Sequence, residues 1–351
     1  MMIQSVEKFT RNLGWKVLHF LKPNQNKSKE TYGFRSIKNP PPIPEIQDFV
    51  DDIIDMAKNV EFEVKTNNFQ QNLEKEKEMI EKEPKLIVGA DKTSNFYKVD
   101  PNQYKDLVKK NVEAEYKKET VANVRKVNKA HKKIVNNLDI EDRVFKTANR
   151  ECFVTLKDHK DNFKNNPKCR LLNPTKCEVG KVSQQILTKK LNIIRRKTGL
   201  KQWKNVYSVI EWFKTLKNKK NLSFIVFDVV NYYPSITLEL LMKALMWARQ
   251  FVDISDEEID IIVETKKSIL YMNGEFWTKK GDTNFDVAQG GFDSAEVCDI
   301  VGLFLLSEIE KLNLKAEVGK FRDDGLGASS ATPRQSEQIK IFFVKYTEST
   351  I

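Results

Sequence analysis

The chain has 351 residues, of which 40% are hydrophobic, so it is long and apolar enough to bury a core and to form two or three domains. Lysine and arginine number 60 against 49 aspartates and glutamates, and the formal net charge of +11 favours a polyanionic partner such as a nucleic acid. These values exclude a chain that is disordered throughout. No apolar run approaches the roughly 18 residues of a membrane span, so we expect no membrane partner.

Cysteine and histidine restrict the chemistry further. The four cysteines show no Cys-x-x-Cys pairing and no histidine at ligand spacing, which favours reduced buried thiols over a zinc site. The three histidines give a histidine-based hydrolase little material. The N-terminus lacks the compact apolar core and the cleavage site of a signal peptide, so we expect an intracellular protein, of the nucleus or the cytoplasm.

The first part of the chain is predicted to be an irregular arm followed by a helical, basic region. Residues 1–44 are assigned to the arm, because 21–45 is polar and interrupted by prolines. Residues 45–145 are assigned to the helical region, in which apolar residues at four-residue steps predict one or two helices over 104–138. The apolar stretch 85–91 predicts a strand that leads into an edge hairpin.

Positive charge is concentrated in this helical region. Between residues 101 and 135 there are ten lysines and arginines against four aspartates and glutamates. Two interpretations fit this excess: a solvated helix face, or a face that binds the phosphate backbone of a nucleic acid.

Two strands and a helix are predicted next. Residues 151–160 and 168–174 each have the pattern of a strand, and the second strand stops at a proline. Residues 180–199 predict a helix with basic side chains that ends at a glycine.

The stretch SFIVFDVV, residues 223–230, is an almost unbroken run of apolar, β-branched and aromatic residues, which predicts a strand buried on both faces. Asp228 interrupts this run. A carboxylate inside such a strand costs several kcal/mol unless it is paired or bound to a cation. A buried ion pair and a metal ligand are therefore the two alternatives for Asp228.

Asp323 and Asp324 are adjacent in GKFRDDGLG, residues 319–327. One interpretation is a hairpin tip, because Asp-Gly is a strong two-residue turn signal. The other is a metal site, because phosphoryl transfer to a hydroxyl uses two divalent ions with hard oxygen ligands, and Asp228, Asp323 and Asp324 together would supply them. Mg²⁺ is the ion that we expect, with Mn²⁺ as the alternative.

Three segments, FDVVNYYPSI, AQGGFDSAEV and FRDDG, resemble in this order the palm motifs of reverse transcriptases. The resemblance implies that Asp228, Asp323 and Asp324 form the catalytic metal site. It also implies that Tyr233, five residues after the first aspartate, excludes a sugar 2′-hydroxyl, because a rigid ring under the sugar leaves no room for the extra oxygen. The alternative is that Tyr232 and Tyr233 are ordinary packing residues at the end of a strand.

The second of these segments implies a nucleotide-binding loop. Gln289 and Gly290 match the Gln-Gly that lines the nucleotide and the template in the family, and Ser294 matches a serine five residues after the glutamine. A glycine lets the backbone approach a base pair closely. Ala295 stands where the family usually has a proline. The run VGLFLLSEI, residues 301–309, predicts a buried helix behind the loop.

Upstream, TLKDHK and KCRLLNP resemble the fingers motifs in which a lysine and an arginine grip the incoming triphosphate. Lys157 and Arg170 are the matching residues, with Lys160 as a further candidate, and a point charge and a guanidinium fork together suit phosphate neutralisation. Within the family, these segments and GADKTSNFYKVDPNQY, residues 89–104, are most similar to Penelope-like retroelement proteins.

The resemblance covers about 150–330 and implies an α+β right-hand polymerase fold, with fingers at 146–222 and a palm at 223–351. Little of the chain follows Asp324. We therefore expect the palm to be incomplete and the thumb to be absent, as in a truncated polymerase, and activity to be weak or distributive.

The implied function is that of an RNA-directed DNA polymerase, in which a primer 3′-hydroxyl attacks a deoxynucleoside triphosphate with the help of two Mg²⁺ ions. The implied partners are an RNA or DNA template with its primer, and dNTPs. Two alternatives stay open: a non-catalytic nucleic-acid-binding remnant of such a polymerase, and an unstable fragment with no activity.

Overall fold

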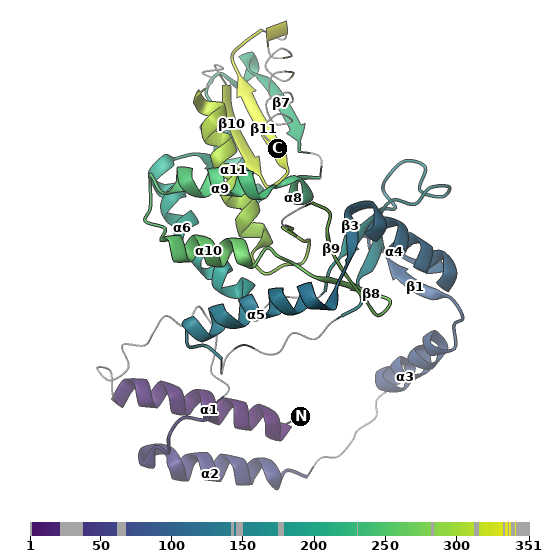
Figure 1. Ribbon diagram of the computed structural model, residues 1–351, viewed down its shortest axis with the longest axis vertical. Coiled ribbons are helices and arrows are strands. Elements are labelled where there is room, and N and C mark those ends of the chain that lie inside the picture. Colours follow the sequence, from purple (N-terminus) through teal and green to yellow (C-terminus); the bar gives the residue numbers. More distant parts are fainter. Residues whose placement is uncertain are drawn as a thin grey trace.

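The computed structural model describes residues 2–21, 38–61, 68–141, 150–174, 179–229, 231–281, 284–311 and 316–332, together with positions 144, 334, 335, 337 and 341. Figure 1 shows a group of helices with a four-stranded sheet on one side and a group of short hairpins on the other. Helix α5 (Val121–Asn137) runs below both groups. No helix in the described ranges is long and apolar enough to cross a membrane.

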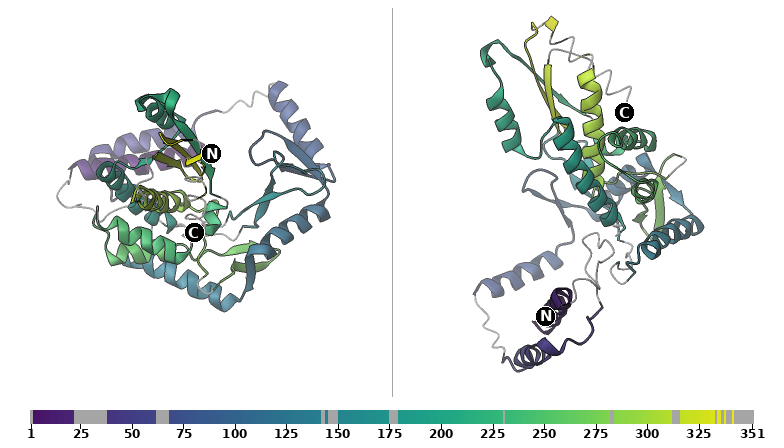
Figure 2. Two further views of the ribbon diagram at one scale, coloured as in Figure 1. Left: turned by 90° about the horizontal axis from the view of Figure 1, so that it is seen from above. Right: turned by 90° about the vertical axis from the view of Figure 1, so that its left-hand side faces the viewer.

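The N-terminal segment is helical where an irregular arm was predicted for 1–44. Helix α1 (Met2–Leu21) packs beside α2 (Pro44–Lys58) at one end of the molecule, and α3 (Asn68–Glu81) follows (Figures 1 and 2). The prediction was wrong for 2–21 because the prolines that suggested an arm begin only at Pro23. Residues 22–37 lie outside the described ranges.

The hairpins form a layer that we call the hairpin layer. It consists of β1 (Leu86–Gly89) with β2 (Phe96–Val99), β4 (Phe153–Leu156) with β5 (Cys169–Leu172), and the sheet of β3 (Tyr116–Glu119), β9 (Glu275–Lys279) and β8 (Leu270–Met272). Single β-bridges, Ala90 to Leu156 and Glu151 to Tyr271, connect the three units. The predicted strands at 85–91, 151–160 and 168–174 are confirmed.

Helix α4 (Pro101–Glu115) covers the hairpin layer. Asp100 caps it by accepting hydrogen bonds from the N–H groups of Asn102 and Gln103, and Val108 and Val112 are buried against the strands. The helices predicted over 104–138 are therefore two, but β3 separates α4 from α5 and was not predicted.

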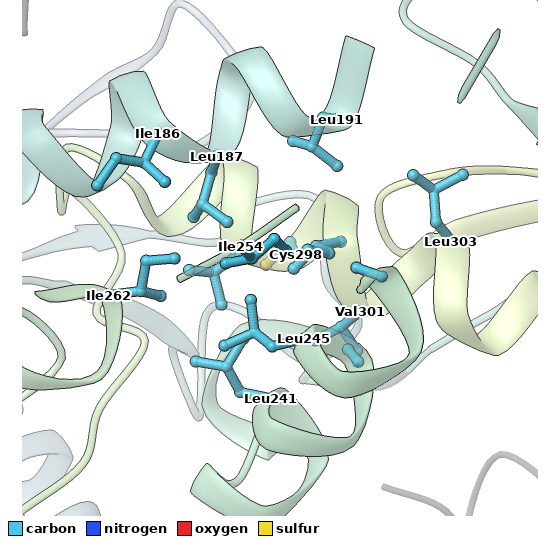
Figure 3. Close-up of a cluster of buried hydrophobic side chains, with 14 of the residues drawn as sticks. Ile186, Leu187, Leu191, Leu241, Leu245, Ile254, Ile262, Cys298, Val301 and Leu303 are labelled. Carbon is cyan, nitrogen blue, oxygen red and sulfur yellow. The ribbon is translucent and has the colours of Figure 1, made fainter. Parts of the chain in front are cut away.

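The main core lies between four helices, α6 (Gly180–Thr198), α9 (Leu238–Ala248), α10 (Asp256–Glu264) and α11 (Ser294–Lys311). Figure 3 shows side chains from all four meeting at one centre, among them Leu187, Leu245, Ile262 and Val301. The predicted helix at 180–199 is confirmed, and it ends as expected at Gly199, whose φ of 67° is left-handed. The buried helix predicted at 301–309 is part of α11.

The four-stranded sheet has the strand order β6 (Lys201–Gln202), β10 (Ala316–Phe321), β11 (Asp324–Ser329), β7 (Ser223–Asp228). One face of this sheet packs on α11 and on the short helix α8 (Tyr232–Ser235). The other face is covered by α7 (Val206–Thr215), where Trp203 and Trp212 pack near Ala328. The 3₁₀ turn η1 (Lys219–Asn221) leads from α7 into β7.

Strand β7 corrects the prediction of a strand buried on both faces. It is the last strand of the sheet in the described part of the chain, and Phe224 and Val226 on one of its faces are 43% and 71% exposed. Only Ile225 is fully buried. Asp228 is exposed as well, so burial alone does not require a charged partner for it.

Truncation of the core tests this packing. Leu245 is completely buried between the helices, whereas its neighbour Met246 is 42% exposed. We expect Leu245→Ala to lower the free energy of unfolding by about 2–5 kcal/mol, because it removes buried methyl groups and leaves a cavity. Met246→Ala is the matched control and should change it by less than about 1 kcal/mol. Urea unfolding followed by circular dichroism measures both, and equal losses would contradict the placement of the core.

Candidate functional site

The three predicted aspartates lie together at one end of the four-stranded sheet. Strands β10 and β11 are joined by a two-residue turn, Arg322 and Asp323, and the register of the sheet places Asp324 directly opposite Asp228 on β7. Side chains opposite each other in an antiparallel pair have Cβ atoms about 4.5–5.5 Å apart. The carbonyl oxygen of Asp323 accepts a hydrogen bond of 3.0 Å from the N–H of Val229, which ties the turn to the end of β7.

The segment 319–327 is therefore a hairpin, as one of the two interpretations predicted, and Asp323 and Asp324 lie at its tip. The predicted Asp-Gly turn is misplaced, because Asp324 and Gly325 already belong to β11. The turn residue Arg322 has a φ of 54°, a conformation that residues other than glycine adopt rarely. A positive φ at the first central position is the pattern of a type II′ hairpin turn.

Electrostatics show that the carboxylates act on one another. Burial raises the pKa of Asp324, and the charges of Asp323 and Asp228 raise it further, while the charge of Lys92 opposes them. Such a like-charge cluster suits a divalent cation, whose charge would relieve the repulsion. As the side chains are placed, no three acidic, histidine or cysteine side chains in the described ranges converge closely enough to hold a metal ion.

Gly325 lets the two carboxylate strands pair closely. It lies opposite Phe227, and a Cβ atom at this glycine would stand 2.0 Å from Cζ of the phenylalanine ring. Real Cβ atoms do not approach so near, so the ring or the strand would have to move. The position next to Asp324 therefore has to be glycine if Asp228 is to stay opposite it.

The two tyrosines after β7 have different surroundings. Tyr232 is buried, and its hydroxyl donates a hydrogen bond of 2.7 Å to the carbonyl oxygen of Cys298 in α11, so it is a packing residue. Tyr233 is half-buried. Burial raises its pKa to about 12, with a smaller effect of neighbouring charges that include Asp323. Of the two tyrosines, Tyr233 keeps an accessible part beside the carboxylates.

A buried lysine that the sequence did not predict lies under the same end of the sheet. Lys320 on β10 is 2% exposed, and its ammonium nitrogen is 3.8 Å from the ring centroid of Tyr232, a cation–π contact. Burial lowers its pKa to about 8, while charges that include Asp323 and Asp228 oppose the shift. It was missed because a lysine in a short strand shows its inward direction only once the register is known.

The predicted phosphate-binding residues lie in the hairpin layer. Lys157 follows β4 directly, and its pKa is lowered by burial and by the charge of Arg170 on β5, so the structure brings the two together. Nε of Arg170 lies 3.0 Å from Oδ1 of Asp91, in the loop between β1 and β2. The further candidate Lys160 is exposed.

The predicted nucleotide-binding loop precedes α11. Gly290 has a φ of 106°, which favours glycine, and a Cβ atom there would stand 3.2 Å from the carbonyl oxygen of Asn173. The hydroxyl of Ser294 donates a hydrogen bond of 2.8 Å to the carbonyl oxygen of Ala288 and closes the loop. Gln289 and Gly290 thus lie between the end of β5 and the start of α11.

Comparison with known proteins supports the fold. No model of a known protein family matches the sequence, and neither does any curated protein. The chain is similar to the apo telomerase of Candida tropicalis, with a TM-score of 0.51 and 12% identity over 97% of this chain and 67% of that protein. The chain has a reverse-transcriptase-like polymerase fold.

Other solved structures match as well, among them two further telomerases. One is a Candida tropicalis telomerase truncated from its C-terminal domain, with a TM-score of 0.48 and 14% identity over 73% of this chain and 54% of that one. The other is the Candida albicans telomerase in complex with a TWJ fragment of telomeric RNA, with a TM-score of 0.48 and 11% identity over 96% of this chain and 67% of that one. The chain spans about half to two thirds of the length of these telomerases.

A methyl group at Gly325 tests the strand pairing that aligns the carboxylates. We expect Gly325→Ala to lower the free energy of unfolding by about 1–3 kcal/mol, because the new Cβ atom overlaps the ring of Phe227. Gly89→Ala in β1 is the matched control, since this glycine also faces a phenylalanine, Phe96, but its Cβ atom would be 3.7 Å away, an ordinary contact. Thermal unfolding measures both, and equal effects would contradict the register of β7 and β11.

The buried lysine gives a pH-dependent stability. The pKa of Lys320 is about 8 in the folded protein against an ordinary value of 10.5, so between these values the unfolded state binds more protons. Its contribution therefore makes the folded state more stable as the pH rises through this window, by up to about 3 kcal/mol. Lys320→Met should lack this contribution, and Lys201→Met, at an exposed position of β6, should keep it. Urea unfolding of the three proteins at pH 8 and 10 measures the difference, and parallel curves would contradict it.

Proposed function

We propose that the chain is an RNA-directed DNA polymerase that transfers a deoxynucleotide to a primer 3′-hydroxyl by a two-metal mechanism. The observation that carries the proposal is the pairing of Asp228 opposite Asp324, with Asp323 in the adjoining turn, at the sheet end of a polymerase-like fold. Three carboxylates in two segments separated by a helical core supply the acidic ligands that this chemistry needs. The finer assignment, to a Penelope-like retroelement protein, is proposed from the sequence segments alone.

The donor set suits Mg²⁺, or Mn²⁺ as the alternative, because carboxylate oxygens are the ligands that such hard cations prefer. Asp228, Asp323 and Asp324 would hold two ions, which supply activation of the attacking hydroxyl and neutralisation of the triphosphate. Burial raises the pKa of Asp324 most, and the charges of Asp323 and Asp228 add to the shift; this second effect, a repulsion among the carboxylates, favours the uptake of positive charge. The three aspartates are exposed, so their side chains are free to rotate toward a bound ion.

The other site residues would orient the nucleotide. Tyr233 beside the carboxylates would exclude a 2′-hydroxyl and so select dNTPs. Lys157 and Arg170 would bind phosphate oxygens, the arginine through its planar fork. Gln289 and Gly290 would line the nucleotide and the template, because a glycine has no side chain to keep a ligand from the backbone. Catalysis would then consist mostly of positioning and charge neutralisation.

Helix α5 offers a surface for the template and primer. It contains no aspartate or glutamate, and its five lysines and arginines are all exposed: Arg125, Lys126, Lys129, Lys132 and Lys133. Its buried residues, Val124, Val127 and Val135, define the inward side, so the cations share the opposite side. This surface also favours the second candidate function, a non-catalytic nucleic-acid-binding protein, because phosphate contacts alone would hold a nucleic acid.

Primer extension on an RNA template with dNTPs and Mg²⁺ or Mn²⁺ tests the proposal. We expect incorporation by the wild-type chain and a loss of about 100-fold or more for Asp323→Ala, because a metal ligand is removed. Asp51→Ala is the matched control, since Asp51 belongs to another exposed Asp-Asp pair, in α2, and should leave the rate unchanged.

The result that would contradict polymerase activity is also measurable. Binding of a labelled primer–template is followed by fluorescence anisotropy over a range of salt concentrations. Salt-dependent binding by both the wild type and Asp323→Ala, with no incorporation by either, would establish the non-catalytic alternative. Loss of incorporation in Asp51→Ala as well would show that the assay reports stability and not a metal site.

A further inference from the structure

The loop between β1 and β2, residues 90–95, is held firmly by the loop that follows β4. The N–H of Asp91 donates a hydrogen bond of 2.8 Å to the carbonyl oxygen of Leu156. One carboxylate oxygen of Asp158 accepts three hydrogen bonds, from Oγ1 of Thr93 at 2.6 Å, from Nδ2 of Asn95 at 2.9 Å and from the hydroxyl of Tyr97 at 2.9 Å. Three of these hydrogen bonds fix the short loop itself, and the fourth fixes Tyr97 in β2, just after it.

A charged contact fixes the same loop from the other side. The side chain of Asp91 is only 7% exposed, and its carboxylate faces Nε of Arg170 on β5 at 3.0 Å. Arg170 in turn lies near Lys157, whose pKa its charge lowers. The loop is therefore built into the group of residues that we assign to phosphate binding.

Lys92 stands between the two anchored residues of this loop, Asp91 and Thr93. Its side chain is exposed, and within the described ranges it has no salt-bridge partner. Asp91 is fixed against Arg170, and Thr93 is fixed against Asp158. The backbone of Lys92 is therefore held beside Lys157 and Arg170, the residues that we assign to phosphate binding.

We propose that Lys92 binds a phosphate group of the incoming nucleoside triphosphate, as a third cation beside Lys157 and Arg170. A triphosphate placed between the hairpin layer and the aspartates needs positive charge on the side that the metal ions do not cover. Lysine suits this position because its compact ammonium group on a flexible stem can follow the ligand, while the anchored backbone limits the entropy that is lost. The inference rests on the proposed function.

Nucleotide kinetics of three variants test the proposal. We expect Lys92→Ala to raise the KM for a dNTP about tenfold in primer extension, with the Kd for primer–template unchanged, because only the triphosphate loses a contact. Lys92→Arg should recover most of the loss, because it keeps the charge. Lys164→Ala, at an exposed lysine of the loop between β4 and β5, is the matched control and should behave as wild type. Equal melting temperatures show that the variants are folded.

Binding without turnover separates this proposal from the proposed function. A fluorescent deoxynucleoside triphosphate is titrated in Ca²⁺ with the wild type, Lys92→Ala and Lys164→Ala. Weaker binding by Lys92→Ala alone supports the role of Lys92 even if the wild type extends no primer. Extension by the wild type with unchanged KM and unchanged nucleotide binding in Lys92→Ala overturns the role of Lys92 and leaves the polymerase activity in place. Absence of any nucleotide binding by the wild type overturns it too.

Discussion

The pairing of β7 with β11 is the constraint on which the rest of the structure depends. It places Asp228 and Asp324 opposite each other, and like charges in directly opposed positions of a sheet repel. The pairing is kept because other contacts favour it: Gly325 leaves room for the ring of Phe227, and the turn at Arg322 brings β10 back along β11. The fold therefore stores a repulsion at one edge that a bound cation would relieve.

Two layers act on this edge from different sides. Below the sheet, the buried ammonium group of Lys320 and the ring of Tyr232 fill the space against α11, so the strands cannot shift without opening the core. From the hairpin layer, Lys92 adds positive charge that acts on Asp324. Carboxylates on one element and cations on the other would suit the metal-bound triphosphate of the proposed function.

Local signals predicted much of this fold. Short strand patterns predicted β1, β2, β4 and β5, a terminal glycine predicted the end of α6, and an apolar run predicted part of α11. The edge position of β7 could not be predicted from local signals, because an apolar run has the same pattern whether its second face is covered or open. The hairpin of β8 and β9 was not among the predicted elements, although Asn273-Gly274 between its strands is a strong turn signal. Motif spacing predicted that the aspartates belong together. The places of Lys92 and Lys320 in the fold, however, depend on contacts between segments far apart in the sequence.

The open side of β7 has a consequence for the protein in solution. In the described part of the chain, no strand pairs with its outer edge, and Val226 and Phe224 leave apolar surface next to the unpaired backbone groups. Such an edge is a template for strand addition by another chain. Lysines, prolines or a bulge would discourage such pairing, but SFIVFD has none of them. We therefore expect self-association at this edge to increase with protein concentration and to involve the strand that carries Asp228.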